Sequence, residues 1–280
     1  WGGLRQTEPT EDLESVRLLT SDGTDNGGWK VATTENSIPF SALGYMIGKR
    51  LSAQEPDVPI GLVKAAYGGS GIVQWVPSYA ANWNPQAKRM MAGSNKKGDL
   101  YTSRLLPVKN FKYSAAVWYQ GEANTSYDKG TEYETMMISL INNWRNVLED
   151  GDLPFIIIQL PTANFSTIYA PERIGTGVRA AQWNVSERLE NVETVVSIDT
   201  GATNNVHPSD KQPIADRAAA FIRDYINGTE SDIKSPSFDY MERSGDTLVL
   251  HFKNTYGSLK TDDGSAPVGF ELKGADGTYS

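Results

Sequence analysis

The sequence contains no cysteine and only two histidines in 280 residues. Without cysteine, disulfides, thiolate metal sites and a cysteine nucleophile are excluded. No stretch approaches the roughly 18 consecutive apolar residues of a membrane-spanning helix. Runs of lysine or arginine are also lacking, and the formal net charge is −8. A nucleic acid or a membrane is therefore not expected as a partner.

What remains is an ordinary globular composition, with 39% hydrophobic and 21% charged residues. This composition suits one large core, or one core with a small appendage. The chain starts at Trp1 rather than methionine and has no signal-peptide pattern. Its last residues resemble a strand that runs into a turn. We therefore expect a processed or truncated product that is cut at both ends.

Short apolar runs alternate with segments of helical spacing over the first 226 residues. Near-continuous apolar runs are typical of parallel strands buried on both faces. Four such strands are predicted, at residues 59–67, 114–119, 155–160 and 194–198.

Three helices are predicted between and around these strands. Apolar residues from Tyr133 to Leu148 recur at helical intervals, and residues 40–51 form a shorter helical pattern. Another helix follows His207, where Ser209 and Gln212 resemble a capping box. Strand–helix alternation predicts an α/β fold with a parallel sheet that is covered on both faces.

The pattern changes after residue 228. A strand is predicted at 247–252, after the Gly245–Asp246 turn, and a second at 264–272, with no helix between them. We therefore predict an α/β domain over residues 1–229 and the start of a small, incomplete β domain over residues 230–280.

Polar residues that come after the predicted strands form the candidate site, because ligands of open α/β sheets bind at the carboxyl ends of the strands. His207 is the natural general base, since imidazole exchanges protons near neutral pH. The other histidine, His251, lies inside a predicted strand. The alternative is that His207 is a surface histidine that caps the helix beginning near Ser209.

The sequence Gly68-Gly69-Ser70 suggests a nucleophile, but it does not complete the required motif. A nucleophile elbow needs Gly-x-Ser-x-Gly, and here Ile72 occupies the last position. Paired glycines more often allow a tight turn or the close approach of a ligand. We therefore expect the N–H groups of Gly68 and Gly69, rather than the Ser70 hydroxyl, to act in the site.

Gln120, Glu122 and Asn124 lie two apart directly after a predicted strand. If this stretch stays extended, the three side chains point to the same side. A buried cluster of two amides and a carboxylate is costly unless it has partners. The cluster is therefore either a site or a hydrogen-bonded structural loop.

Several motifs together resemble the sialate O-acetylesterase family of the SGNH hydrolases, over about residues 30 to 226. The most specific is Trp-Tyr-Gln-Gly-Glu-x-Asn, which is matched in full at residues 118–124. The others, in the family's order, are Phe40-Ser41-Ala42, Pro59-Ile60-Gly61-Leu62-Val63, Tyr67-Gly68-Gly69-Ser70, Gln74-Trp75, Trp144-Arg145, Leu153-Pro154-Phe155, Gln159-Leu160, Arg179-Ala180-Ala181-Gln182 and His207-Pro208-Ser209-Asp210-Lys211.

The resemblance implies a flavodoxin-like three-layer core and hydrolysis of an ester through an acyl-serine intermediate, with His207 as the base. It implies that the oxyanion is held by backbone N–H groups at Gly68 or Gly69 and by an amide of Gln120 or Asn124. Substrate contacts are expected from Gln120, Glu122 and Ser70. The implied substrate is an acetylated sugar, either sialic acid or a decoration of a plant polysaccharide, and no metal or organic cofactor is implied.

The sequence departs from the family pattern at two points. The family's Gly-Gln-Ser-Asn-Met nucleophile block is absent, and Trp1-Gly2-Gly3 resembles the residues just after that block in the family, so we expect the serine upstream of Trp1. Many SGNH enzymes carry aspartate three residues before the histidine, where this chain has Asn204. The acid of the triad is then Asp199 or Glu122, or the serine–histidine pair works without a carboxylate.

Two rival functions stay open at this stage. One is a non-catalytic glycan-binding relative that lacks the nucleophile, and the other is an esterase that uses Ser70. A periplasmic or extracellular location is expected from the resemblance alone.

Overall fold

A computed structural model describes residues 10–22, 28–92, 94–125, 130–168, 175–229, 234–261 and 263–278. Trp1-Gly2-Gly3, which resemble the sequence after the nucleophile block, lie outside the described residues. The chain divides into two compact units, Trp1–Ser231 and Asp232–Ser280. Whether the boundary expected after residue 229 separates independent domains stays a prediction.

The first unit contains two three-stranded sheets. In one, the order is β2-β1-β3: β1 (Leu13–Thr20) pairs in parallel with β3 (Ile60–Lys64), and the short β2 (Lys30–Ala32) is antiparallel at the edge. The other sheet consists of β4 (Ala116–Trp118), β5 (Phe155–Ile158) and β6 (Val192–Val195). Its order is β4-β5-β6, and both pairings are parallel.

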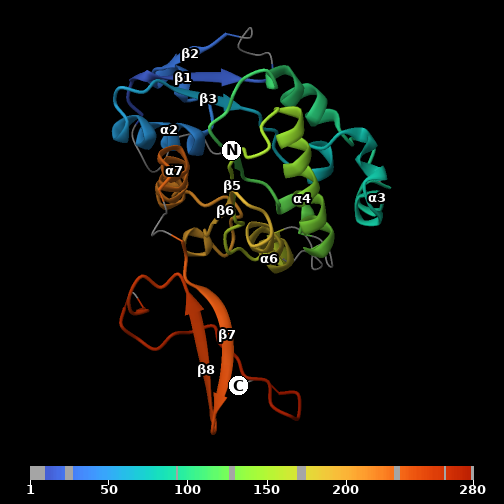
Figure 1. Ribbon diagram of the computed structural model, residues 1–280, viewed down its shortest axis with the longest axis vertical. Coiled ribbons are helices and arrows are strands. Elements are labelled where there is room, and N and C mark those ends of the chain that lie inside the picture. Colours follow the sequence, from blue (N-terminus) through green and yellow to red (C-terminus); the bar gives the residue numbers. More distant parts are fainter. Residues whose placement is uncertain are drawn as a thin grey trace. The chain divides into compact units, whose positions relative to one another are not determined.

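Helices cover both faces of β5, because alternate residues of a strand point to opposite sides. Phe155 and Ile157 pack in a cluster with α4 (Gly130–Val147) and α6 (Gly175–Ser186). Ile156 and Ile158 pack in a second cluster with α2 (Ala42–Gln54) and α7 (Gln212–Asn227). Figure 1 shows α2 beside α7 on one side of the strands and α4 with α6 on the other. The expected three-layer α/β arrangement is confirmed.

Helix α4 illustrates why the sequence forms these layers. Its Tyr133, Met136, Met137 and Leu140 are fully buried, as their helical spacing predicts. The remaining short elements connect the strands and helices. They are α1 (Thr34–Ser37), η1 (Ile72–Gln74), η2 (Ser78–Asn82), α3 (Pro85–Ala92), a π-helical turn η3 (Tyr101–Leu105), η4 (Leu106–Val108), η5 (Glu122–Asn124), α5 (Phe165–Ile168) and η6 (Ile198–Thr200).

Strands β3, β4 and β5 form where the apolar runs predict them. The fourth strand lies earlier than predicted, because β6 ends at Val195 and Ile198 is already in η6. The capping box at Ser209 is wrong: Lys211 is the N-cap residue of α7, and its side chain makes no capping bond. Instead, the Asp210 carboxylate accepts a hydrogen bond from the Gln212 N–H, at 3.0 Å.

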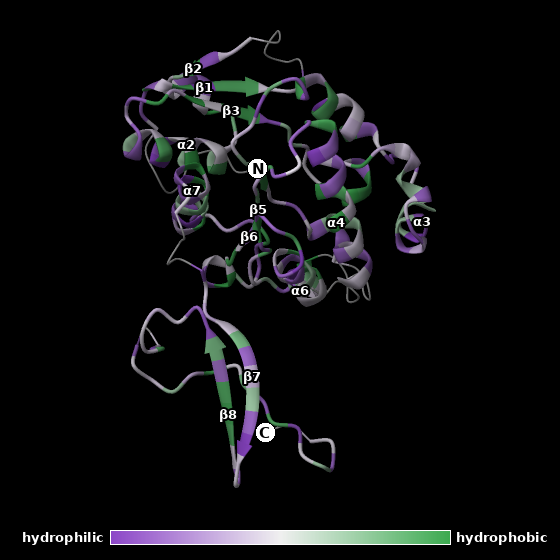
Figure 2. Ribbon diagram, in the orientation of Figure 1, coloured by the Kyte–Doolittle hydropathy of each residue, from purple (hydrophilic) through white to green (hydrophobic). Residues whose placement is uncertain are grey.

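The second unit contains a β-hairpin of β7 (Ser237–Ser244) and β8 (Thr247–Lys253), which turns at Gly245. Strand β8 was predicted, but the second strand expected at 264–272 is wrong. Pro267 and the left-handed backbone of Gly264 and Gly269 interrupt that segment. In Figure 2, β8 is largely hydrophobic whereas β7 mixes polar and apolar residues, which explains why β7 was missed.

Strands β3 and β4 are edge strands, and each leaves one edge without a partner strand among the described residues. Both strands are less covered than β5, which is fully buried. Gly61 in β3 is exposed, and the Val117 side chain in β4 is 40% exposed. At their carboxyl ends, β3 continues into the Gly68 loop and β4 continues into the Gln120 loop.

Candidate active site

The loop after β3 presents two unbonded backbone donors. Gly68 and Gly69 form a turn, and Gly69 has a φ of +70°, a left-handed conformation that favours glycine. No atom lies within 4 Å of the place where a Cβ of Gly69 would be, so the turn is open there. Within the described ranges, neither N–H group donates a hydrogen bond. This turn therefore has the donors that the oxyanion role requires.

Ser70 lies next to these donors, but its hydroxyl is already hydrogen-bonded within the loop. Its buried hydroxyl donates to the Tyr67 carbonyl at 2.7 Å and accepts from the Trp75 indole N–H at 2.9 Å. Both bonds hold the loop together. The geometry argues against the expected substrate contact of Ser70 and against the rival in which Ser70 is the nucleophile.

The loop after β4 is not extended, so the expected alternation of its side chains is wrong. Gly121 turns the chain with a φ of +155°, and residues 122–124 form the 3₁₀ turn η5. A Cβ at Gly121 would lie 2.9 Å from Val178 Cγ1 on α6, so a larger residue does not fit. The turn separates Glu122 from the two amides and brings Gln120 against Asn124.

Both ends of the Gln120 amide form hydrogen bonds within the site. Its Nε2 donates to the Ser70 carbonyl at 2.9 Å and to Asn124 Oδ1 at 2.8 Å. Its Oε1 accepts from the Tyr133 hydroxyl at 3.1 Å, and the side chain is buried. Gln120 therefore ties the two loops together, and its expected substrate contact stays a prediction.

Asn124 has one end of its amide fixed and the other end unbonded. Its Oδ1 accepts from the Ile72 N–H at 3.1 Å and from Gln120 Nε2. Because both partners are donors, the oxygen must face them, which settles the orientation of the amide. Its Nδ2 donates to no acceptor in the part of the chain that the structure describes. Asn124 thus presents an oriented N–H donor, as its expected oxyanion role requires.

His207 lies in the loop between η6 and α7, where the residues on either side of it are buried. Val206 and Pro208 are both covered, while the His207 side chain is exposed. The His207 N–H donates to Asn205 Oδ1 at 2.9 Å. Partial burial, and to a lesser extent the nearby Lys211 ammonium, lower the pKa of His207 below its ordinary value. A lowered pKa keeps the imidazole neutral, as a general base must be.

Lys211 is bonded to the His207 loop and lies close enough to Glu122 for their charges to interact, which the sequence motif did not reveal. Its Nζ donates to the Pro208 carbonyl, beside His207. Burial lowers the pKa of Lys211, and the charges of Glu122 and Asp210 oppose that shift. Burial raises the pKa of the Glu122 carboxyl, and the Lys211 charge opposes it. The Lys211 charge thus opposes the shift at Glu122 and adds to the shift at His207.

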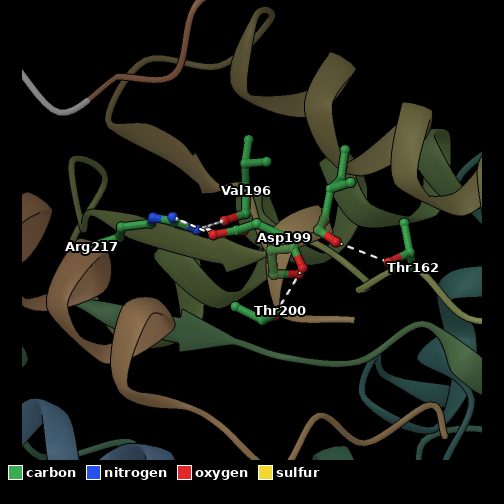
Figure 3. Close-up of polar contacts among 7 residues, drawn as sticks. Thr162, Val196, Asp199, Thr200 and Arg217 are labelled. Carbon is green, nitrogen blue, oxygen red and sulfur yellow. Dashed lines mark hydrogen bonds and ion pairs between the residues drawn. The ribbon is translucent and has the colours of Figure 1, made fainter. Parts of the chain in front are cut away.

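Asp199 forms an ion pair with Arg217. Arg217 Nη1 and Nη2 donate to its two carboxylate oxygens at 2.8 and 2.6 Å, and Nη1 also donates to the Val196 carbonyl (Figure 3). The hydrogen bonds from Arg217 lower the pKa of Asp199. Because both oxygens face Arg217, this geometry argues against Asp199 as the acid of a triad, and that role stays a prediction.

The described ranges hold neither a candidate metal cluster nor a membrane-spanning helix. No group of three or more histidine, aspartate or glutamate side chains there could hold a metal ion. No helix there is both long and apolar enough to cross a bilayer.

Comparison with known proteins shows the family. The model of the carbohydrate esterase, sialic acid-specific acetylesterase family matches residues 19–215. The chain belongs to this family. The match includes the Gly68 turn, the Gln120–Asn124 loop and His207, so the family resemblance derived from the sequence motifs is confirmed.

Curated members of the family are distant relatives. The sialate O-acetylesterase of Homo sapiens is 25% identical in an alignment over 243 residues that covers 76% of this chain and 44% of that protein. The enzyme of Mus musculus is 24% identical over 265 residues, with 76% and 47% covered. The chain thus spans less than half the length of the curated relatives that it matches.

Solved structures support the same assignment. A carbohydrate acetylesterase from Xanthomonas citri superposes with a TM-score of 0.85 at 26% identity, over 99% of this chain and 66% of that one. A protein from Arabidopsis thaliana superposes with a TM-score of 0.51 at 20% identity, over 77% and 82% of the two chains, and shares the fold alone. The SGNH-type α/β fold is therefore established.

Proposed function

We propose that this carbohydrate esterase removes O-acetyl groups from sialic acid or another acetylated sugar through a serine–histidine mechanism with His207 as the base. The observation that carries the proposal is the Asn124 amide. Gln120 and Ile72 fix its oxygen, and its N–H donor is left free beside the loop that carries Gly68 and Gly69. An oriented donor without an acceptor among the described residues suits charge that develops on a substrate oxygen.

The nucleophile in this proposal comes from outside the present sequence. The Ser70 hydroxyl is buried and bonded at both its donor and its acceptor side. The open edges of β3 and β4 lead into the two loops that carry the oxyanion donors. A further parallel strand between those edges would end beside the donors and could carry a serine there.

The reaction then proceeds in two steps. His207 takes the proton of the serine hydroxyl as its oxygen attacks the acetyl carbonyl, and Asn124 Nδ2 with the Gly68 or Gly69 N–H stabilises the oxyanion. The carbonyl re-forms, the sugar oxygen leaves and takes the proton from His207, and the acetyl group stays on the serine. His207 next deprotonates a water molecule that attacks the acyl-enzyme, releasing acetate and restoring the serine.

Acetate release from p-nitrophenyl acetate tests this function. Three proteins are compared: the chain with its native upstream residues, the chain as given, and a His207→Ala variant of the longer form. We expect activity in the longer form alone. Full activity without His207 would overturn the mechanism, and inactivity of all three would favour the non-catalytic glycan-binding alternative.

The substrate needs its own comparison. Release of acetate is measured from O-acetylated sialic acid and from acetylated xylan. Faster turnover of one identifies the substrate class, whereas equal and low turnover of both would contradict a preference for sialic acid. The location outside the cytoplasm stays a prediction.

A further inference from the structure

The segment that carries His207 is folded tightly onto itself. After β6, the Thr200 N–H and hydroxyl both donate to the Ser197 carbonyl, at 3.1 and 2.9 Å. Ala202 and Asn205 then form an antiparallel bridge, and Asn205 Oδ1 accepts from the His207 N–H. These contacts therefore hold the backbone of the segment from Ser197 to His207.

A neighbouring loop, located after β5, holds this segment from one side. Thr162 Oγ1 donates to the Ile198 carbonyl at 2.9 Å, and the Asn164 N–H donates to the Thr203 carbonyl at 2.8 Å. The two bonds lie on either side of Gly201 in the sequence. Figure 3 shows Thr162 and Arg217 on opposite sides of η6, so the segment is held from both directions.

Gly201 allows the two loops to approach this closely. A Cβ at Gly201 would lie 2.1 Å from Thr162 Oγ1, 2.2 Å from its carbonyl oxygen and 2.6 Å from its nitrogen. Two of these atoms are backbone and cannot rotate away. The φ of Gly201 is −72°, which any residue adopts, so the need for glycine comes from contact and not from backbone conformation.

We propose that Gly201 and Thr162 are positioning residues for His207. They keep the segment that carries His207 at a fixed position relative to the oxyanion donors. They act through the contact between the two loops and are not assigned any contact with substrate. This inference rests on the proposed function of His207. It adds two residues that neither the family motifs nor the electrostatics of the site identify.

Gly201→Ala is the direct test, made in the protein with its upstream residues restored. The added methyl group must push the two loops apart, which displaces His207. Because a shift of about 1 Å at a catalytic group can cost roughly 100-fold in rate, we expect kcat on p-nitrophenyl acetate to fall by about that factor with KM little changed. Gly151→Ala is the matched control, since nothing lies within 4 Å of its Cβ position.

Thr162 provides a second test that adds no atoms to the contact. Thr162→Val keeps the shape but removes the hydroxyl donor to Ile198, and Thr162→Ser restores it. We expect kcat to fall by roughly 3- to 10-fold in the valine variant, the effect of one lost neutral hydrogen bond, and to recover in the serine variant. This pair decides the proposal even if Gly201→Ala does not fold.

The chain also allows a readout that does not depend on activity. It has only two histidines, and His251 lies in the other compact unit. We expect the imidazole NMR signals and titration of His207 to change in Gly201→Ala and Thr162→Val, while those of His251 stay constant. If both variants lose stability but leave the His207 signals unchanged, the loop contact is only structural and the proposal is wrong. If the His207 signals move in a protein without esterase activity, the positioning stands and the proposed function fails.

Discussion

Asn124 owes its orientation to two donors, the Ile72 N–H from a distant loop and the Gln120 amide from its own. We expect Asn124→Ala to lower kcat by about 10² to 10³, the typical effect of removing one oxyanion donor, with a much smaller change in KM. The measurement is steady-state acetate release in the longer protein. Asn146→Ala, on the exposed face of α4, is the control and should leave kcat unchanged. A loss confined to KM would mean that Asn124 binds the ground state only.

If His207 is the base, as proposed, its pKa sets the acid limb of the pH profile. Burial and the Lys211 charge disfavour the protonated imidazole and lower the pKa of His207. We therefore expect the acid limb of kcat/KM to lie below the ordinary histidine pKa of 6.5. Replacing Lys211 with methionine removes one of these causes, so the limb should move to higher pH, while Lys211→Arg keeps it in place. Identical profiles for the methionine variant and the unmodified protein would contradict the coupling.

The candidate site residues could be predicted from the sequence, but the hydrogen bonds that each of them forms could not. His207, Asn124 and the glycine pair come after predicted strands, and topology alone brings such residues together. Gln120 donates to the Ser70 carbonyl and Asp199 pairs with Arg217, and these partners are 50 and 18 residues away. No local pattern predicts such contacts. The supporting role of Gln120 and the ion pair of Asp199 therefore required the structure.

At the scale of elements, Asp199 and Arg217 join η6 to α7. Their hydrogen bonds lower the pKa of Asp199, so this pair stabilises the fold above the ordinary Asp pKa of 3.8 and loses that effect as the pH falls through the lower folded value. Because the Asp199 side chain is 52% exposed, we expect Asp199→Asn to cost only about 0.2–1 kcal/mol at pH 7.

Urea unfolding of the protein and of Asp199→Asn, at pH 7 and near pH 2, checks this expectation. The difference should be present at pH 7 and absent at the acidic pH. Asp246→Asn is the control, since its carboxylate is fully exposed and lies 3.8 Å from Arg243. A difference that persists at acidic pH would show that the pair is not the cause.

Strands were predictable where burial on both faces makes a run continuously apolar, as in β5. Strand β1 was missed because charged residues such as Glu14 and Arg17 interrupt its apolar positions. The extended conformation assumed for the Gln120 loop failed at Gly121, where a close contact with α6 imposes the turn. Helix α4 was predicted well because one covered face has the helical period.

At the scale of the whole molecule, the open edges of β3 and β4 should be closed by a further strand if the proposed source of the nucleophile is right. Unpaired N–H and C=O groups on such edges form hydrogen bonds when a partner strand is present. We expect backbone amides of β3 and β4 that face the open edges, including Val63 and Val117, to exchange hydrogen more slowly in the longer protein than in the chain as given. Amides of the central strand β5 should be protected in both forms.

Equal exchange rates at β3 and β4 in the two forms would contradict this prediction.

The division into two sheets could not be foreseen from the sequence, because strand order depends on pairings between distant segments. The apolar runs predict that β3 and β4 are strands, but they do not specify which strand lies beside which.

Strand β5 separates two hydrophobic clusters, because its successive residues belong alternately to one cluster and to the other. A change of side-chain volume at Ile156 alters the packing against α2 and α7, and the same change at Ile157 alters the packing against α4 and α6. Related proteins could therefore repack one helical layer over evolutionary time while the opposite layer keeps its ancestral side chains.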